Sequence, residues 1–384
     1  MSAINTEVDS AVRSLFSVND YFVAEEGAAE YSVAFDNRSS SNFLKLLKLL
    51  KRPGYSAQLY GDPEHATLLV TKNPPLPERR PQVLKLSAPV FLFFLTLLST
   101  FVTGYVVAVI FPDIAPNSSP LEMGAGFEAG LLAVLVSREL VHRYIEGKGS
   151  FSSVSYFLPN VPLFVPIPTM YFLPTFGSVS FPSTPSANRN KLFDFYFLGS
   201  LVAVAVAAVV AFLGAGTSVV LSQSDYAALL AGNQTATIQT NPSIIQTAAL
   251  SLAQSVGLSP AVPPGGTLIF SPIEIAAWLG LLLAFFNLMP AGLFDGGRMA
   301  RLVLGDKGSR ATTMVTGALL LVVDLPNYWV IFVLLFLMAS FPVQGETLDS
   351  ISGLSSSRKA VFVVAIVVGL LCVPSPQTFA TLPA

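Results

Sequence analysis

Residues 135–144 read LVSRELVHRY and place three ionisable side chains, Arg138, Glu139 and His142, in an otherwise apolar run. Spacings of three and four residues bring side chains to one face of a helix. An ionisable side chain inside a membrane helix is costly unless a partner or an ion neutralises it, and it marks a functional site. The stretch therefore predicts a membrane helix with a polar centre on one face.

The composition of the whole chain is typical of a membrane protein. Its 384 residues are 52% hydrophobic and 11% charged, and the mean hydropathy is +0.64, whereas soluble domains have about 25% charged residues. A net charge of −2 gives no reason to expect a nucleic-acid partner. The single cysteine, Cys372, excludes an intramolecular disulfide and a cysteine-based zinc cage. The first residues contain Glu7 and Asp9 and no apolar core, so no signal or transit peptide is predicted.

Three regions are expected along the chain. Residues 1–86 are predicted to be a small α+β domain with a linker, 87–376 a transmembrane domain, and 377–384 a tail. Within the first region, the strand patterns are 28–36, 56–62 and 66–73, and 40–51 has helical spacing with lysines on its outer face. The stretch NPPLPERRP, 73–81, is the linker into the membrane.

The apolar segments predict an all-α polytopic fold with about six to seven transmembrane helices, since a span needs roughly 20 residues. The candidates are 88–111, 125–145, 192–221, 272–292, a short hairpin of 311–324 with 328–342, and 359–373. Loops 112–124 and 222–271 contain no Lys or Arg, whereas the other connections are basic. By the positive-inside rule the protein is expected in the cell membrane, multi-pass, with its N-terminal domain cytoplasmic.

One apolar stretch, 156–185, contains seven prolines and cannot form a continuous helix. Non-helical backbone at membrane depth is tolerated only when it is buried in protein or lines a cavity. We therefore expect strands and re-entrant turns that form a wall of an internal site. The alternative is a loop that lies on the cytoplasmic leaflet.

A second polar motif, NLMPAGLFDGGRMAR, ends a predicted membrane helix at 287–301. Asp295 at membrane depth costs roughly 2.5–3.5 kcal/mol on insertion scales and needs a partner or an ion. Gly296 and Gly297 allow close backbone approach or a turn with positive φ. Two helices are thus predicted to bring polar groups to one place inside the membrane.

Together these motifs resemble the site-2 protease family of intramembrane zinc metalloproteases, and within it an archaeal and plastid-type subgroup. That family has His-Glu-x-x-His on one helix and Asn-x-x-Pro-x-x-x-x-Asp-Gly-Gly on a later one; here they correspond to 138–142 and 287–297. Further motif positions lie at 167–177, ending in Gly177, and at 188–194, ending in Asp194 and followed by Gly199. The resemblance runs from about residue 80 to 376.

The resemblance implies a role for each matching residue. Glu139 corresponds to the general base, and His142 and Asp295 correspond to zinc ligands. Asn287 and Pro290 correspond to the motif that positions substrate backbone, although Asn287 could instead hydrogen-bond a neighbouring helix.

Arg138 occupies the position of the first zinc-binding histidine. A guanidinium remains protonated and has no lone pair for a metal, which leaves two protein ligands. Val141, Ser200 and Leu293 also depart from the family pattern, where Ser200 replaces a proline, and we interpret these departures as loss of a constraint. We predict instead an Arg138–Asp295 ion pair, with two parallel hydrogen bonds and with Glu139 and His142 alongside.

Three functions remain open on these residues. The first is a proteolytically impaired homologue that binds membrane-anchored helical proteins or peptides within the bilayer. The second is an active zinc-dependent intramembrane endopeptidase with altered metal ligation. The third is a transporter-like scaffold, but such folds show internal repeats, and none is seen here. As a structural alternative, Arg138, His142 and Glu146 could mark the end of a membrane helix that reaches the aqueous surface.

Overall fold

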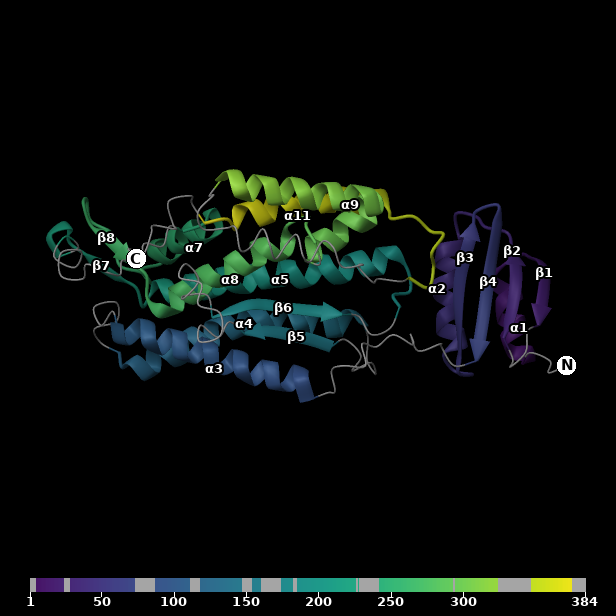
Figure 1. The fold of residues 1–384 in the computed structure, drawn as a ribbon, viewed down its shortest axis with the longest axis horizontal. Coiled ribbons are helices and arrows are strands. Elements are labelled where there is room, and N and C mark those ends of the chain that lie inside the picture. Colours follow the sequence, from purple (N-terminus) through teal and green to yellow (C-terminus); the bar gives the residue numbers. More distant parts are fainter. Residues whose placement is uncertain are drawn as a thin grey trace.

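The structure is a computed structural model. It describes residues 5–23, 28–72, 87–110, 118–146, 154–159, 174–181, 185–225, 227, 242–292, 294–323 and 347–374. Figure 1 shows a small N-terminal unit beside a longer helical part.

The N-terminal unit is an α+β module with a core of its own. Its antiparallel sheet has the strand order β1-β2-β4-β3. The elements are α1 (Thr6–Leu15), β1 (Val18–Val23), β2 (Ala29–Val33), α2 (Ser39–Leu50), β3 (Tyr55–Asp62) and β4 (His65–Lys72). Alternating residues of β2 and β4 point into the core, where they meet Phe43, Leu46 and Leu50 of α2. The predicted strand, helix, strand, strand order is present, and α1 and β1 are additional.

The helical part contains three helices that are long and apolar enough to cross a membrane, counted among the described residues: Ala88–Ile110, Pro120–Ile145 and Arg189–Ala215. They belong to α3 (Ser87–Ile110), α4 (Pro120–Glu146) and α5 (Arg189–Ala215). The shorter α8 (Pro272–Leu288) is apolar and almost entirely buried, and it packs against α4 and α5. Asn188 begins α5 by accepting from the backbone N–H of Lys191, and Ser271 begins α8 in the same way.

Two helices complete this part. α9 (Asp295–Val323) bends at Gly305, whose φ of 74° is left-handed, and α11 (Ser356–Leu371) packs against α8 and α9. The first half of the predicted short hairpin, 311–324, is helical up to residue 323 and forms the end of α9. Its second half, 328–342, lies outside the described residues. The expected loop 222–271 contains α7 (Ile244–Ser255) and β8 (Thr267–Ile269), and β8 pairs with β7 (Val219–Leu221), which directly precedes the loop.

The proline-rich stretch contributes a two-stranded antiparallel sheet of β5 (Val154–Pro159) and β6 (Thr175–Phe181). Tyr156 faces Val179 in the register, and β6 lies against α4. Gly177 has φ +89°, a backbone conformation that favours glycine. The expected strands are thus present, and the segment that joins them lies outside the described residues.

A short segment, residues 347–352, links the N-terminal unit to the helical part; we call it the strap. The backbone N–H of Leu59 in β3 donates to the Leu348 carbonyl at 2.7 Å, and the N–H of Ser350 donates to the Leu59 carbonyl at 3.0 Å. On the other side, Leu348 donates to Ser186, just before α5, at 2.8 Å. Leu348 and Ile351 also pack on the N-terminal core. The strap therefore holds the two parts together.

Candidate functional site

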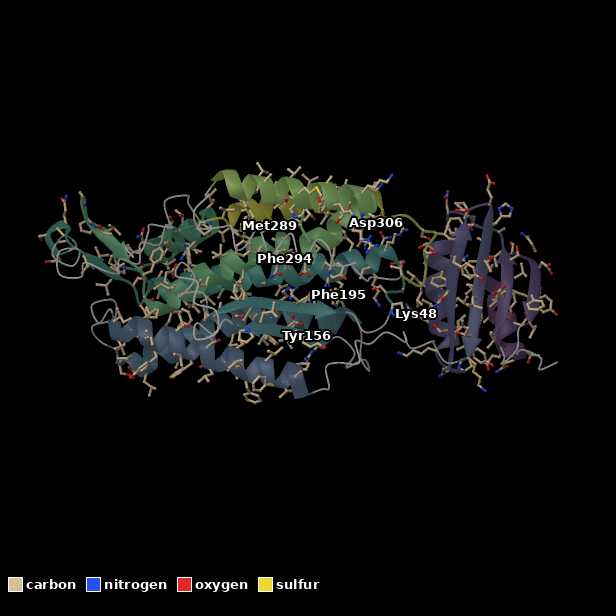
Figure 2. The ribbon with its side chains drawn as sticks, in the orientation of Figure 1. Lys48, Tyr156, Phe195, Met289, Phe294 and Asp306 are labelled. Atoms are coloured by element: carbon tan, nitrogen blue, oxygen red, sulfur yellow. The ribbon has the colours of Figure 1, made fainter. Side chains whose placement is uncertain are left out.

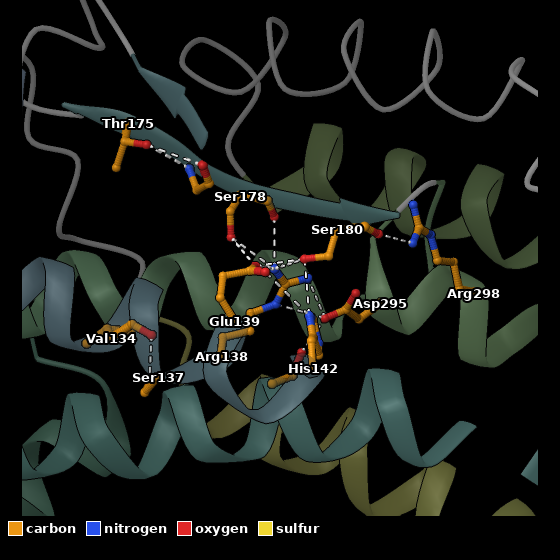
Figure 3. Close-up of polar contacts among 12 residues, drawn as sticks. Val134, Ser137, Arg138, Glu139, His142, Thr175, Ser178, Ser180, Asp295 and Arg298 are labelled. Atoms are coloured by element: carbon orange, nitrogen blue, oxygen red, sulfur yellow. Dashed lines mark hydrogen bonds and ion pairs between the residues drawn. The ribbon is translucent and has the colours of Figure 1, made fainter. Parts of the chain in front are cut away.

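Four elements bring polar side chains to one buried centre in the helical part (Figure 3). These elements are α4, β6, α5 and the start of α9. Its ionisable members are almost inaccessible to solvent: Arg138 is 3% exposed, Glu139 4%, His142 0%, Asp295 2% and Arg298 3%. Buried charges must be paired, so the hydrogen bonds determine what this centre can do.

The guanidinium of Arg138 binds the carboxylate of Asp295. Its Nε and Nη2 atoms both donate to Oδ2, at 3.0 and 2.7 Å. The predicted ion pair is present, but its geometry differs from the expected one, because both donors converge on one oxygen. The third nitrogen of the guanidinium, Nη1, donates instead to Glu139 and Ser178.

Glu139 is held by donors on two elements. Its Oε1 accepts from Nη1 of Arg138 at 3.0 Å, from Ser178 Oγ at 3.0 Å and from Ser180 Oγ at 2.7 Å. Residues 178 and 180 are two apart on β6, so both side chains point to the same face of the strand. The β5–β6 sheet therefore forms a wall of the centre, as expected from the composition of the proline-rich stretch.

His142 lies beside this network with its ring stacked on Phe195, at 4.1 Å between centroids. Its Nδ1 is 3.1 Å from Ser180 Oγ. Because the Ser180 proton is donated to Glu139, the hydroxyl accepts from Nδ1, and in the neutral ring Nε2 is bare. Within the part of the chain that the structure describes, the buried Nε2 has no hydrogen-bond partner, and it faces Gly199, where a Cβ would overlap it. Gly199 thus makes room for the imidazole.

Asp295 is the first residue of α9, and its Oδ2 accepts a third hydrogen bond from Ser200 Oγ at 2.8 Å. Gly296 and Gly297 let the start of α9 approach the end of α8, since a Cβ on either would collide with backbone carbonyls of 288–292. Neither glycine has a positive φ. Both positions therefore need glycine because the backbones of α8 and α9 approach closely, and not because the chain makes an unusual turn.

A further cation, Arg298, also reaches the centre. One turn into α9, its Nη1 donates to the Ser180 carbonyl at 2.7 Å, and its guanidinium carbon lies 5.2 Å from the centre of the Tyr196 ring. The centre therefore holds two cations, Arg138 and Arg298, and two carboxylates, so its formal charge is balanced.

The remaining predicted residues lie apart from the network. Asp194 forms an ion pair with Arg358 of α11 at 2.6 Å and does not reach the centre. Asn287 and Pro290 are half-buried at the end of α8, and within the described residues no hydrogen bond joins Asn287 to this network. Glu146 is outside the described side chains. The other residues that the sequence did not indicate are Ser178, Ser180, Phe195 and Tyr196.

The residues present do not fit a zinc ion. Among the described residues no group of three or more His, Cys, Asp or Glu side chains is arranged to hold a metal. A catalytic zinc takes three protein ligands, whereas only His142 and Asp295 are available besides Glu139. Arg138 donates directly to the Asp295 oxygen, so a guanidinium charge already occupies the place that a cation would need.

Comparison with known proteins finds similarity over part of the chain. Residues 167–323 match the model of Peptidase family M50. The chain is 29% identical over 226 residues to "Probable zinc metalloprotease EGY2, chloroplastic" of rice (Oryza sativa subsp. indica), which covers 57% of this chain and 38% of that protein. It is 32% identical over 127 residues to the Arabidopsis thaliana protein of the same name, 32% of this chain and 22% of that one.

The corresponding rice protein named EGY1 (Oryza sativa subsp. japonica) is 24% identical over 229 residues, 56% of this chain and 37% of that protein. The matched part of the chain thus spans less than two fifths of the length of these relatives. No solved structure matches significantly.

Proposed function

Because the chain belongs to the site-2 protease family, peptidase family M50, we propose that it is a member without proteolytic activity that binds membrane-anchored helical proteins or peptides. In this proposal the Arg138–Asp295 ion pair takes the place of the metal. The polar centre then stabilises a family fold whose substrate-binding surface is retained.

The observation that carries the proposal is the pairing of Arg138 with Asp295 at 2.7 Å. A guanidinium cannot bind a metal through a lone pair, and it cannot activate water as a Lewis acid. Glu139 is also poorly suited to act as a base, since its Oε1 accepts three hydrogen bonds. Hydrolysis of a peptide bond needs an activated water molecule, and nothing in this arrangement supplies one.

Partner binding is supported by the polar residues that the network leaves out. Asn287 is a half-buried amide near the end of an apolar helix, and within the described residues it has no side-chain hydrogen bond. A hydrogen-bond donor and acceptor at this depth is costly unless it is satisfied. The backbone of an inserted partner segment would satisfy it, and the motif position of Asn287 and Pro290 is consistent with this role.

A second candidate is the active endopeptidase with altered metal ligation. One observation favours it: Nε2 of His142 is buried and has no hydrogen-bond partner among the residues that the structure describes. A bare imidazole nitrogen is what a zinc ligand presents. For this candidate Arg138 would have to leave Asp295, and two ligands would then require a third from elsewhere.

The location of the protein is part of the proposal. The family is membrane-embedded, and three described helices are apolar and long enough to span. We place the chain in the cell membrane as a multi-pass protein with the N-terminal unit on the cytoplasmic side. The Lys/Arg asymmetry of the loops supports this orientation.

Metal content separates the two candidates. The protein, purified without chelators, is expected to contain well under one zinc per chain and to leave a site-2 model substrate uncut. Arg138→His should raise zinc binding, because it restores an imidazole at the first ligand position. Arg143→His is the matched control, since Arg143 is exposed on the same helix, and it should not bind zinc. Stoichiometric zinc in the unmodified protein, lost on Asp295→Ala, would establish the metalloprotease instead.

A further inference from the structure

The outer face of α2 carries a stripe of cations. Arg38, Lys45, Lys48 and Arg52 are spaced so that they lie on the same side of the helix, and all four are exposed. The opposite side of α2 is buried in the N-terminal core. α2 itself contains no acidic residue. The exposed face is therefore uniformly positive.

This charge is not neutralised by ion pairs. Throughout the part of the chain that the structure describes, none of the four side chains forms a salt bridge. The nearest carboxylate along the chain, Asp36, accepts from the Ser39 hydroxyl and the backbone N–H of Arg38, so it lies at one end of the stripe. By contrast, Arg13 on α1 of the same unit is paired with Asp9.

The strap fixes the orientation of the exposed face of α2 relative to the long helices. Through Leu59 and Ser186 it holds the N-terminal unit beyond one end of the long helices. α2 lies on the side of the unit that faces those helix ends (Figure 1). Figure 2 labels Lys48 on this side of the unit, and it labels Asp306, next to the Gly305 bend of α9, at the end of the helical part that lies toward the unit.

The helical part is rich in cations at the end that lies toward α2, where Arg301 is paired with Asp306 and Arg358 with Asp194. The exposed or partly exposed cations at this end of α5, α9 and α11 are Arg189, Lys191, Arg301, Lys307, Arg310, Arg358 and Lys359. Of these helices α5 is long and apolar enough to span, and basic residues at the end of such a helix mark the level of the lipid headgroups. A surface opposite α2 would thus be formed by headgroups around these helix ends.

We propose that α2 lies on the membrane surface and that its cations bind the headgroups of anionic phospholipids. Each Lys or Arg near an anionic leaflet strengthens binding about fivefold, and the attraction extends over a Debye length of about 8–10 Å. Leu49, 52% exposed next to the stripe, adds an apolar contact with the interface. The inference does not depend on whether the buried centre binds zinc.

The test uses the full chain in lipid nanodiscs, which removes any question of sidedness. One set contains only phosphatidylcholine and the other contains added phosphatidylglycerol. The rate at which an amine-reactive reagent modifies Lys48 is measured by mass spectrometry. We expect it to be about fivefold slower with the anionic lipid and to recover at high salt. Lys72 on β4 lies outside the stripe and should react at the same rate in both lipids.

A pair of charge reversals supplies the matched control. Lys48→Glu should restore modification of Lys45 in anionic discs to its rate in phosphatidylcholine, whereas Lys72→Glu should leave it slow. Equal rates in the two lipids would overturn the proposal. So would equal protection in lipid-free detergent, which would mean that the chain itself covers α2. Protection that depends on protein concentration would point to a second copy and would also overturn it.

Discussion

The hydroxyl of Ser200 lies 2.8 Å from Oδ2 of Asp295 and donates to it. The same oxygen accepts both contacts from Arg138. Position 200 is proline in the family pattern, and proline has neither a hydroxyl nor a backbone donor. Two departures from that pattern, at 138 and 200, therefore act on one carboxylate. Ser200 is thus part of a connected polar network, in addition to departing from the family pattern.

Ser200→Ala should destabilise the protein by about 1.5–3 kcal/mol, since a hydrogen bond to a buried charged group is lost. The measurement is the free energy of unfolding in detergent. Ser137→Ala is the control, because Ser137 on α4 only donates to the carbonyl of Val134 in its own helix. An equal effect of the two substitutions would show that Ser200 contributes nothing special to Asp295.

Much of the site could be predicted from the sequence because charges in apolar helices are rare. Arg138, Glu139 and Asp295 had to find partners inside the protein, and pairing was the solution once a metal ligand was missing. Ser178 and Ser180 gave no such signal, since serines are common in apolar stretches and burying one costs little free energy. Arg298 gave no distinct signal either, because it precedes Arg301 at a predicted membrane boundary, where cations usually mark topology.

The fold was predictable to a similar extent and for related reasons. Long apolar runs gave α3, α4 and α5, and alternation gave β2 and β4. β1 was missed because its residues are mostly exposed and show no alternation. The strap was missed because its backbone hydrogen bonds join residues almost 300 positions apart, such as Ser350 and Leu59, and its six residues are too few to show a periodicity.

Gly199→Ala should destabilise the protein by about 1–3 kcal/mol, the usual cost of overpacking. The new methyl group would overlap Nε2 and Cδ2 of His142 and push the ring away from Phe195. Thermal unfolding in detergent measures the effect. Gly353→Ala is the control, because a Cβ there meets nothing within 4 Å. Unchanged stability of Gly199→Ala would mean that the ring can move freely.

Ser350→Pro should release the N-terminal unit from the strap. Proline removes the N–H that donates to Leu59 and the hydroxyl that donates to the same carbonyl. Hydrogen exchange of the Leu59 amide is a direct readout, since this amide donates to Leu348, and exchange should become faster. Ser350→Ala keeps the backbone bond and should leave the amide protected. Protection that survives the proline variant would show that other contacts hold the two parts.

The proposed orientation can be tested by labelling single cysteines in intact cells. Positions 60, 235 and 305 are exchanged one at a time. A membrane-impermeant thiol reagent should modify position 235, in the predicted outside loop, and should not reach positions 60 and 305. The native Cys372 is buried and serves as the background. Modification of position 305 from outside would reverse the orientation that the Lys/Arg asymmetry predicts.

A double-mutant cycle can isolate the interaction between Arg138 and Asp295. Arg138→Met or Asp295→Asn alone should destabilise the protein by about 3–5 kcal/mol, because each leaves a buried charge without its partner. The double variant should cost much less than the sum, since Glu139 and Arg298 then remain as one carboxylate and one cation and the centre stays neutral. Unfolding free energies of the four proteins in detergent give the interaction energy.

The chain provides its own comparison for this cycle. Asp194 and Arg358 form an ion pair of the same chemical type with 2.6 Å between the atoms, but their side chains are 34% and 30% exposed. Partly exposed pairs of this kind contribute about 0.2–1 kcal/mol. Asp194→Asn and Arg358→Met should therefore be nearly additive, while the buried pair should show strong coupling. Additive costs at Arg138 and Asp295 as well would mean that neither charge depends on the other, and the idea that the ion pair substitutes for a metal would have to be given up.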